Sequence, residues 1–275
     1  MVVVTGTKRS GTSLWMQILG AAGLPVVGDA FPGHWEQSLH AANPRGFFES
    51  RLRRGIYYRT NPDPKTGDYL HPRDVRHHAV KVFVPGVVRT DIAFLNRVVA
   101  TVRPWREAVD SLARLHALEA AWHRDKAVDE ADLDRRLQRL HRSRSDLPPA
   151  IEWWLEIYEL VRDHSVRRYP LRWTALRKVR AEPEAAILPV LRWLGADGLD
   201  LAAAVDCVDS TLDRSTPADV DLDPAWARVF DAVEEAAMCG PRLPVSLLRD
   251  MNRLNRAVEA RFRRLSPERG AEEQP

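Results

Sequence analysis

The chain has 275 residues, 45% of them hydrophobic, which is enough for one α/β domain with a full buried core. Its formal net charge of +3 suits an anionic ligand but is too small to indicate nucleic-acid binding. Cys207 and Cys239 are too far apart for a zinc motif or a disulfide framework, and no apolar run resembles a membrane span or a secretory segment, so we expect a cytoplasmic protein.

The pattern of apolar residues predicts strands that alternate with helices. A strand over 2–5, a turn over 6–11 and a helix over 12–23 come first. Residues 25–72 are rich in Pro, Gly, Asn and aromatic residues, so we expect an irregular region there. The other predicted elements are strands over 79–84, 97–102 and 170–174 and helices over 105–122, 129–145, 149–163 and 182–194.

This alternation favours βαβ units and therefore a parallel sheet. We predict the α/β class, with three layers in which helices flank the sheet on both faces. A single domain over 1–265 contains a helical insertion or lid over 129–163, and residues 266–275 form a polar tail.

The turn after the first strand carries the strongest functional pattern. Gly6 and Gly11 have the spacing of a phosphate loop, in which backbone N–H groups and a helix N-terminus face an anion. Thr12 stands where a Walker lysine would be, and the cations lie inside the loop as Lys8 and Arg9. We therefore expect a phosphate-binding loop unlike that of an ordinary NTPase.

Two segments resemble the PAPS-dependent sulfotransferases, bacterial-type members in particular; PAPS is 3′-phosphoadenosine 5′-phosphosulfate. The run Lys8-Arg9-Ser10-Gly11-Thr12-Ser13 resembles their 5′-phosphosulfate loop. Arg103 at the end of a predicted strand, followed eight positions later by Ser111 on a helix, resembles their 3′-phosphate site. The resemblance implies a P-loop-like fold and transfer of a sulfonate group from PAPS to a hydroxyl or amine of a small-molecule, lipid or glycan acceptor.

The resemblance also implies a role for each matching residue. Arg9 and Lys8 would stabilise charge on the departing phosphate, and no metal would be needed. Residues 25–72 would form the acceptor side. The residues implied to bind the cofactor are Lys8, Arg9, Ser10, Gly11, Thr12, Ser13, Arg103, Ser111 and, from a late loop, Arg214.

Sulfonate transfer also requires a base that takes the proton of the acceptor. Phe83 occupies the position at which cytosolic members of the family have a histidine. The stretch from Asn43 to Glu49 resembles a segment of bacterial members that ends in glutamate, so Glu49 is the predicted base, with His34 and Glu36 as reserves. The alternative for Glu49 is a surface ion pair with Arg45 or Arg51.

Two other functions are compatible with a phosphate-binding loop. One is a P-loop kinase of small molecules, and the other is a nucleotide-binding protein without catalytic activity. The sequence identifies neither the acceptor nor the oligomeric state.

Overall fold

The computed structural model describes residues 1–142, 144–212, 214 and 216–262. It contains a five-stranded sheet in the order β2-β3-β1-β4-β5, and every strand pair is parallel. The predicted α/β class with a parallel sheet is therefore confirmed. The strands are β1 (Val2–Gly6), β2 (Val26–Val27), β3 (Ala79–Lys81), β4 (Arg97–Val102) and β5 (Leu171–Ala175).

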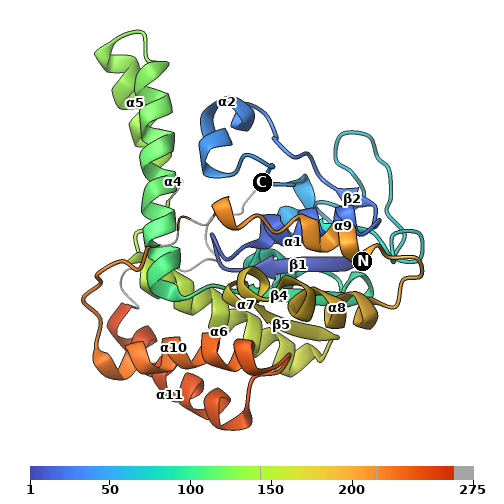
Figure 1. Ribbon diagram of the computed structural model, residues 1–275. Helices are drawn as coiled ribbons and strands as arrows, with labels where there is room; N and C mark the ends of the chain where they lie inside the picture. The colour runs from blue at the N-terminus through green and yellow to red at the C-terminus, as the bar shows by residue number, and fades with distance from the viewer. Residues whose placement is uncertain (143, 213, 215, 263–275) are drawn as a thin grey trace.

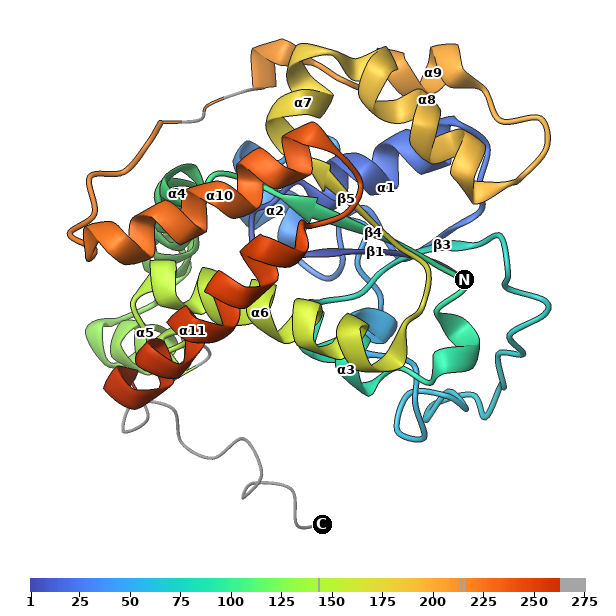
Figure 2. The ribbon, with the colours of Figure 1, turned by 90° about the horizontal axis from the view of Figure 1, so that it is seen from below.

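Helices lie on both sides of the sheet (Figures 1 and 2). The α-helices are α1 (Thr12–Ala21), α2 (Trp35–Leu39), α3 (Val84–Arg89), α4 (Trp105–Asp125), α5 (Glu130–Arg142), α6 (Pro149–Arg167), α7 (Leu176–Ala181), α8 (Pro183–Leu194), α9 (Leu201–Asp206), α10 (Pro224–Cys239) and α11 (Val245–Phe262). The 3-10 helices are η1 (His40–Ala42), η2 (Arg51–Arg54), η3 (Ile92–Phe94) and η4 (Ser210–Leu212).

The central strand β1 is buried on both faces because consecutive side chains of a strand point in opposite directions. Val2 and Val4 belong to the core that includes Trp15 of α1, whose side chain is fully buried. Val3 belongs to the opposite core, which includes Trp154 of α6. Because the β-branched run makes β1 the central strand, the turn that follows β1 lies at the middle of the sheet, on the edge where the strands have their carboxyl ends.

One local prediction needs correction. The strand predicted over 79–84 ends at Lys81, and Val84 begins α3 with Pro85 in its first turn. Proline suits that position because its fixed φ is helical and its missing N–H is not needed there. The region 25–72 is largely irregular, as expected, and its elements are the short β2, α2, η1 and η2; β2 forms because Val26 and Val27 pair with β3. Helices α9, α10 and α11 follow the last predicted element.

Helices α4 and α5 extend beyond the rest of the molecule as a hairpin (Figure 1). Helix α5 has no buried residue, whereas α6 packs into the core through Trp153, Trp154 and Ile157. The region predicted as an insertion thus comprises an exposed helix and a core helix. The predicted tail 266–275 lies outside the described residues. Among the helices of the described ranges, none is both long and apolar enough to cross a membrane.

Candidate functional site

The loop between β1 and α1 is held tightly against strand β4. Gly6 has φ 151°, and a Cβ atom there would lie 2.4 Å from the Thr101 carbonyl oxygen, so only glycine fits. Ser10 is fully buried; its hydroxyl donates to the Thr7 carbonyl at 2.7 Å, and its own carbonyl accepts from the Thr101 hydroxyl at 3.0 Å. Arg9 adopts φ 65°, which is uncommon outside glycine. The Ser10 hydroxyl therefore holds the loop and does not line the cavity.

The N-terminus of α1 faces the cavity without a side-chain cap. The helix begins at Thr12 after Gly11, which has φ 96°, and no side chain of the described residues donates or accepts as its cap. The N–H groups of the first turn have no partner within a helix. Thr12 and Ser13 line the cavity there. Free N–H groups at a helix N-terminus are suited to bind an anion.

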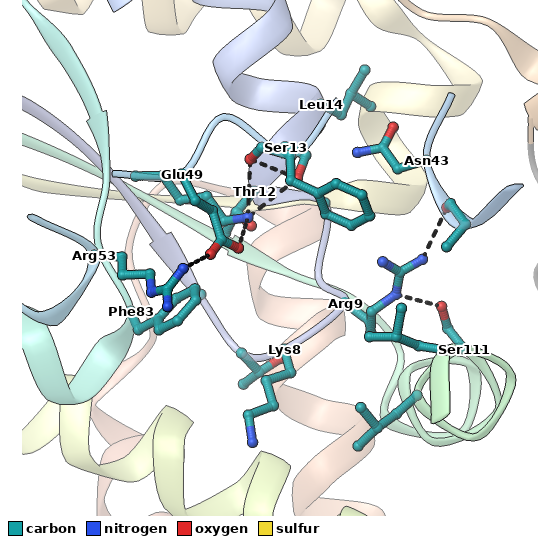
Figure 3. A pocket seen from close by; sticks show the side chains of 18 of the residues that line it. Lys8, Arg9, Thr12, Ser13, Leu14, Asn43, Glu49, Arg53, Phe83 and Ser111 are labelled. Atoms are coloured by element: carbon teal, nitrogen blue, oxygen red, sulfur yellow. Dashed lines mark hydrogen bonds and ion pairs between the residues drawn. The ribbon is translucent and has the colours of Figure 1, made fainter. Parts of the chain in front are cut away.

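The two segments that the resemblance pointed to lie in direct contact. The Arg9 Nε atom donates to the Ser111 hydroxyl at 3.0 Å (Figure 3), and Arg103 Nη1 donates to the Arg9 carbonyl at 3.2 Å. Arg103 is buried and also pairs with Glu107 at 3.3 Å. Burial, followed by the charges of Arg103 and Arg114, lowers the pKa of Arg9 to about 10. The part of the site formed by Arg9 and Arg103 therefore carries buried positive charge.

Arg214 reaches the same region from the chain segment after α9. Its Nη1 atom donates to the Ala41 carbonyl at 2.9 Å, and Arg9 Nη2 donates to the adjacent Ala42 carbonyl at 3.3 Å. Both arginines line the cavity. Two adjacent carbonyl groups of helix η1 therefore accept hydrogen bonds from Arg214 and Arg9 and hold the two side chains at the same part of the cavity.

Lys8 points to helix α6 and is held there by two carboxyl groups. Its ammonium lies 2.7 Å from Glu152 Oε1, and its backbone N–H donates to Glu156 Oε2 at 3.2 Å. Burial first, and the neighbouring charge of Glu152 second, raise the pKa of Glu156 to about 7. Sequence reasoning missed Glu156. The only signal was a glutamate on a helix face otherwise made of residues such as Trp153 and Ile157.

Glu49 lies inside the cavity and not on the surface. Its side chain is 5% exposed, with Oε1 at 3.0 Å from the Lys81 ammonium and Oε2 at 2.9 Å from Arg53 Nη1 (Figure 3). The surface pairs considered for it do not form, since Arg45 pairs with Asp209 and Arg51 with Asp63. Both oxygens of the predicted base are therefore engaged by cations.

Lys81 is a further site residue that the sequence did not single out. It ends β3, and its ammonium lies 3.3 Å from the Ser13 hydroxyl and 3.1 Å from the Phe47 carbonyl. Burial lowers the pKa of Lys81, an effect that the ion pair with Glu49 opposes. A signal was present in the sequence, because Lys81 lies two residues before Phe83, the position at which the cytosolic sulfotransferases that the sequence resembles have a histidine.

The two reserve residues for the base lie outside the cavity lining. His34 is exposed and stacks on Trp122 of α4 with ring centroids 4.4 Å apart. Glu36 is exposed on α2. The adjacent Trp35 lines the cavity instead. A one-residue step along a helix turns the side chain by about 100°, which explains why Trp35 and its neighbours face different ways.

One cavity of about 880 Å³ is lined by Lys8, Arg9, Glu49, Lys81, Arg103, Ser111, Glu156 and Arg214. It spans the carboxyl edge of the sheet, where ligands bind in open parallel sheets. Among its lining residues, cationic side chains outnumber acidic ones. The cations are Lys8, Arg9, Arg53, Arg54, Arg59, Lys81, Arg89, Arg103, Arg114, Arg180 and Arg214, and the acids are Glu49, Glu119, Glu152, Glu156 and Asp209.

Comparison with known proteins adds no relative: no family model, no curated protein and no solved structure matches the chain. Within the described ranges, no group of three or more His, Cys, Asp or Glu side chains is arranged to hold a metal ion. Any functional conclusion therefore depends on the residues around the cavity.

Proposed function

We propose that the protein is a sulfotransferase that moves a sulfonate group from PAPS to a hydroxyl or amine of an acceptor. The observation that carries the proposal is the hydrogen bond from Arg9 to Ser111, with Arg103 on the Arg9 carbonyl. The loop and the Arg103–Ser111 pair were predicted separately to bind the 5′- and 3′-phosphate ends of one nucleotide. Their contact in a single cavity supports a ligand with both groups.

The donor set suits a multiply charged anion. The first turn of α1 offers uncapped N–H groups, and the Thr7 hydroxyl in the loop is buried without a hydrogen-bond partner among the described residues. Arg9 and Lys81 would hold the 5′-phosphosulfate end from the two sides of the loop. Arg103 and Ser111 would hold the 3′-phosphate, since a guanidinium binds phosphate oxygens with two parallel N–H groups.

Transfer forms a bond from the acceptor oxygen or nitrogen to sulfur and breaks the bond from sulfur to the bridging oxygen. That oxygen leaves on the phosphate with the electron pair, and the acceptor proton goes to a base. Cations and N–H groups placed at the bridging oxygen stabilise charge that grows only in the transition state. Arg9 supplies a fixed positive charge, because even its lowered pKa of about 10 keeps it protonated at neutral pH.

Two buried carboxyl groups that line the cavity, those of Glu49 and Glu156, are candidates for the base. Glu49 would lose an ion pair with Lys81 or Arg53 on taking up a proton. Glu156 has one oxygen on the Lys8 N–H, and its Oε1 has no hydrogen bond with the described residues. A base works best when its pKa is near the working pH, and the pKa of Glu156 is about 7. We therefore assign the base to Glu156 and give Glu49 the role of holding Lys81 beside Ser13.

Calorimetric titration tests the donor. In a chelating buffer, we expect micromolar or tighter binding of 3′-phosphoadenosine 5′-phosphate and at least tenfold weaker binding of adenosine 5′-phosphate. Preference for ATP with magnesium would instead support a P-loop kinase and reject the proposal. Binding of the bisphosphate without sulfonate transfer to any acceptor in a broad screen would support the inactive nucleotide-binding protein.

A further inference from the structure

The cavity has a second basic end on the side of β1 away from Arg103. In the sheet order, β3 and β4 flank β1. Arg103 follows β4, whereas Lys81 and Phe83 lie at the end of β3. Figure 3 shows Phe83 and Arg53 across the cavity from Arg9 and Ser111. In the proposed function the 3′-phosphate lies at the Arg103 end and the phosphosulfate lies between Arg9 and Lys81, so the part of the cavity beyond Lys81, formed by η2 and α3, is left for the acceptor.

The backbones of η2 and α3 are packed against each other without intervening side chains. A Cβ atom at Gly86 would lie 2.7 Å from the Arg53 carbonyl oxygen, and one at Gly55 would lie 2.6 Å from the Gly86 carbonyl oxygen. The Thr90 hydroxyl bonds the Gly86 carbonyl at 2.7 Å and the Ile56 N–H at 3.1 Å. This contact holds the two elements in a fixed relation, so their cavity-facing residues form one surface.

An arginine from each element faces the cavity without an acidic partner. Arg54 of η2 and Arg89 of α3 both line the cavity and are exposed. Neither makes an ion pair or side-chain hydrogen bond with the residues the structure describes. The nearby Glu49 carboxylate forms its ion pairs with Lys81 and Arg53. Two uncompensated guanidinium groups at one end of a cavity favour a ligand with negative charge.

We propose that the acceptor carries, besides its hydroxyl or amine, an oxyanion that Arg54 and Arg89 bind; this proposal rests on the proposed sulfotransferase function. A carboxylate or a phosphate supplies the paired oxygens that a guanidinium fork matches. Tyr57, Phe83 and Pro85 line the cavity at this end. They provide an apolar wall for the body of the acceptor, between its reactive group and its anion.

The probe is a set of phenols that differ only in the remote group: 4-hydroxyphenylacetate, its methyl ester and 4-hydroxybenzylphosphonate. Each is titrated by calorimetry into the chain saturated with 3′-phosphoadenosine 5′-phosphate, and into the chain alone. We expect the two acids to bind at least tenfold more tightly than the ester. A carboxylate preferred over the phosphonate, or the reverse, identifies which oxyanion the site takes.

The double variant Arg54→Gln/Arg89→Gln tests the residues. Both side chains are exposed, so we expect the fold and the affinity for the bisphosphate to be unchanged within about threefold. The advantage of the acids over the ester should fall to about twofold. The matched control is Arg192→Gln, the same change on an exposed arginine of α8 outside the cavity lining, which should keep the full advantage.

Several results would overturn the proposal. These are equal binding of ester and acid, no binding of either acid, displacement of the bisphosphate by the acids, or an advantage of the acids that survives in the double variant. Failure of the proposed function looks different. The bisphosphate itself would not bind, whereas the titrations with the chain alone would still report whether Arg54 and Arg89 select an acid.

Discussion

The Arg9 guanidinium donates a hydrogen bond to the Ser111 hydroxyl at 3.0 Å, across 102 residues of sequence. Arg9 leaves the turn after the central strand, and Ser111 lies in the second turn of α4 after the neighbouring strand. Under the proposed function, Arg9 binds the 5′-phosphosulfate and Ser111 binds the 3′-phosphate of one nucleotide, so this contact joins the two parts of the cofactor site.

Replacement of Arg103 should remove selectivity for the 3′-phosphate. We expect Arg103→Ala to weaken binding of 3′-phosphoadenosine 5′-phosphate at least tenfold more than binding of adenosine 5′-phosphate, because only the first ligand has the group that the guanidinium binds. Calorimetry on both nucleotides measures the difference. Arg106→Ala is the control, since Arg106 pairs with Asp231 and does not line the cavity. Equal losses for the two nucleotides would exclude Arg103 from the 3′-phosphate site.

Glu156 should control turnover without controlling cofactor affinity. We expect Glu156→Gln to lower kcat at least 100-fold while the affinity for the bisphosphate changes by less than about threefold, because general-base catalysis typically contributes about 10²–10⁴-fold. The rate of the unaltered protein should rise with pH through about 7, as Glu156 ionises. A variant that retains this pH profile and its rate would remove Glu156 from the mechanism.

Glu49 should act on binding more than on turnover. Glu49→Gln removes the charge that holds Lys81 beside Ser13, so we expect weaker bisphosphate binding and a smaller loss of kcat than in Glu156→Gln. Steady-state kinetics beside calorimetry separates the two effects. If Glu49→Gln abolishes turnover and leaves affinity intact, Glu49 is the base after all and the assignment to Glu156 fails.

The stability of the protein should depend on pH through Glu156. Its pKa in the folded state, about 7, lies above the usual 4.5, so the contribution of the protonated carboxyl is complete below pH 4.5 and is lost as pH rises through 7. Relative to Glu156→Gln, the unaltered protein should therefore lose stability, by at most about 3 kcal/mol, between pH 4.5 and 8. Urea unfolding of both proteins measures this. A difference that does not change with pH would contradict the raised pKa.

Gly6 should tolerate no side chain. Gly6→Ala places a Cβ atom within 2.4 Å of the Thr101 carbonyl oxygen, and we expect a loss of about 2–4 kcal/mol in the free energy of unfolding. Gly23→Ala is the matched control, because Gly23 also has positive φ, 103°, but no atom lies within 4 Å of an added Cβ. Its loss should be about 1–2 kcal/mol, from backbone strain alone. Equal losses would show that space against β4 is not limiting.

The sequence alone was sufficient for the elements whose signals are local. The valine run of β1, the glycines at both ends of the turn and the helix after it are read from neighbouring residues, and so is Arg103 at the end of β4. Because both strands are parallel and buried, their carboxyl ends had to meet at one edge of the sheet. The contact between the loop and the Arg103–Ser111 segment could therefore be anticipated.

The tertiary structure decided the partners of the charged residues. Glu49 was expected either as a free base or in a surface pair, but the packing of β3 against β1 brings Lys81 onto one of its oxygens. Glu156 became a site residue only because α6 passes beneath the loop and buries its carboxyl against the Lys8 N–H. Such pairings join residues far apart in the chain, and burial then sets their pKa values. No local pattern encodes either of them.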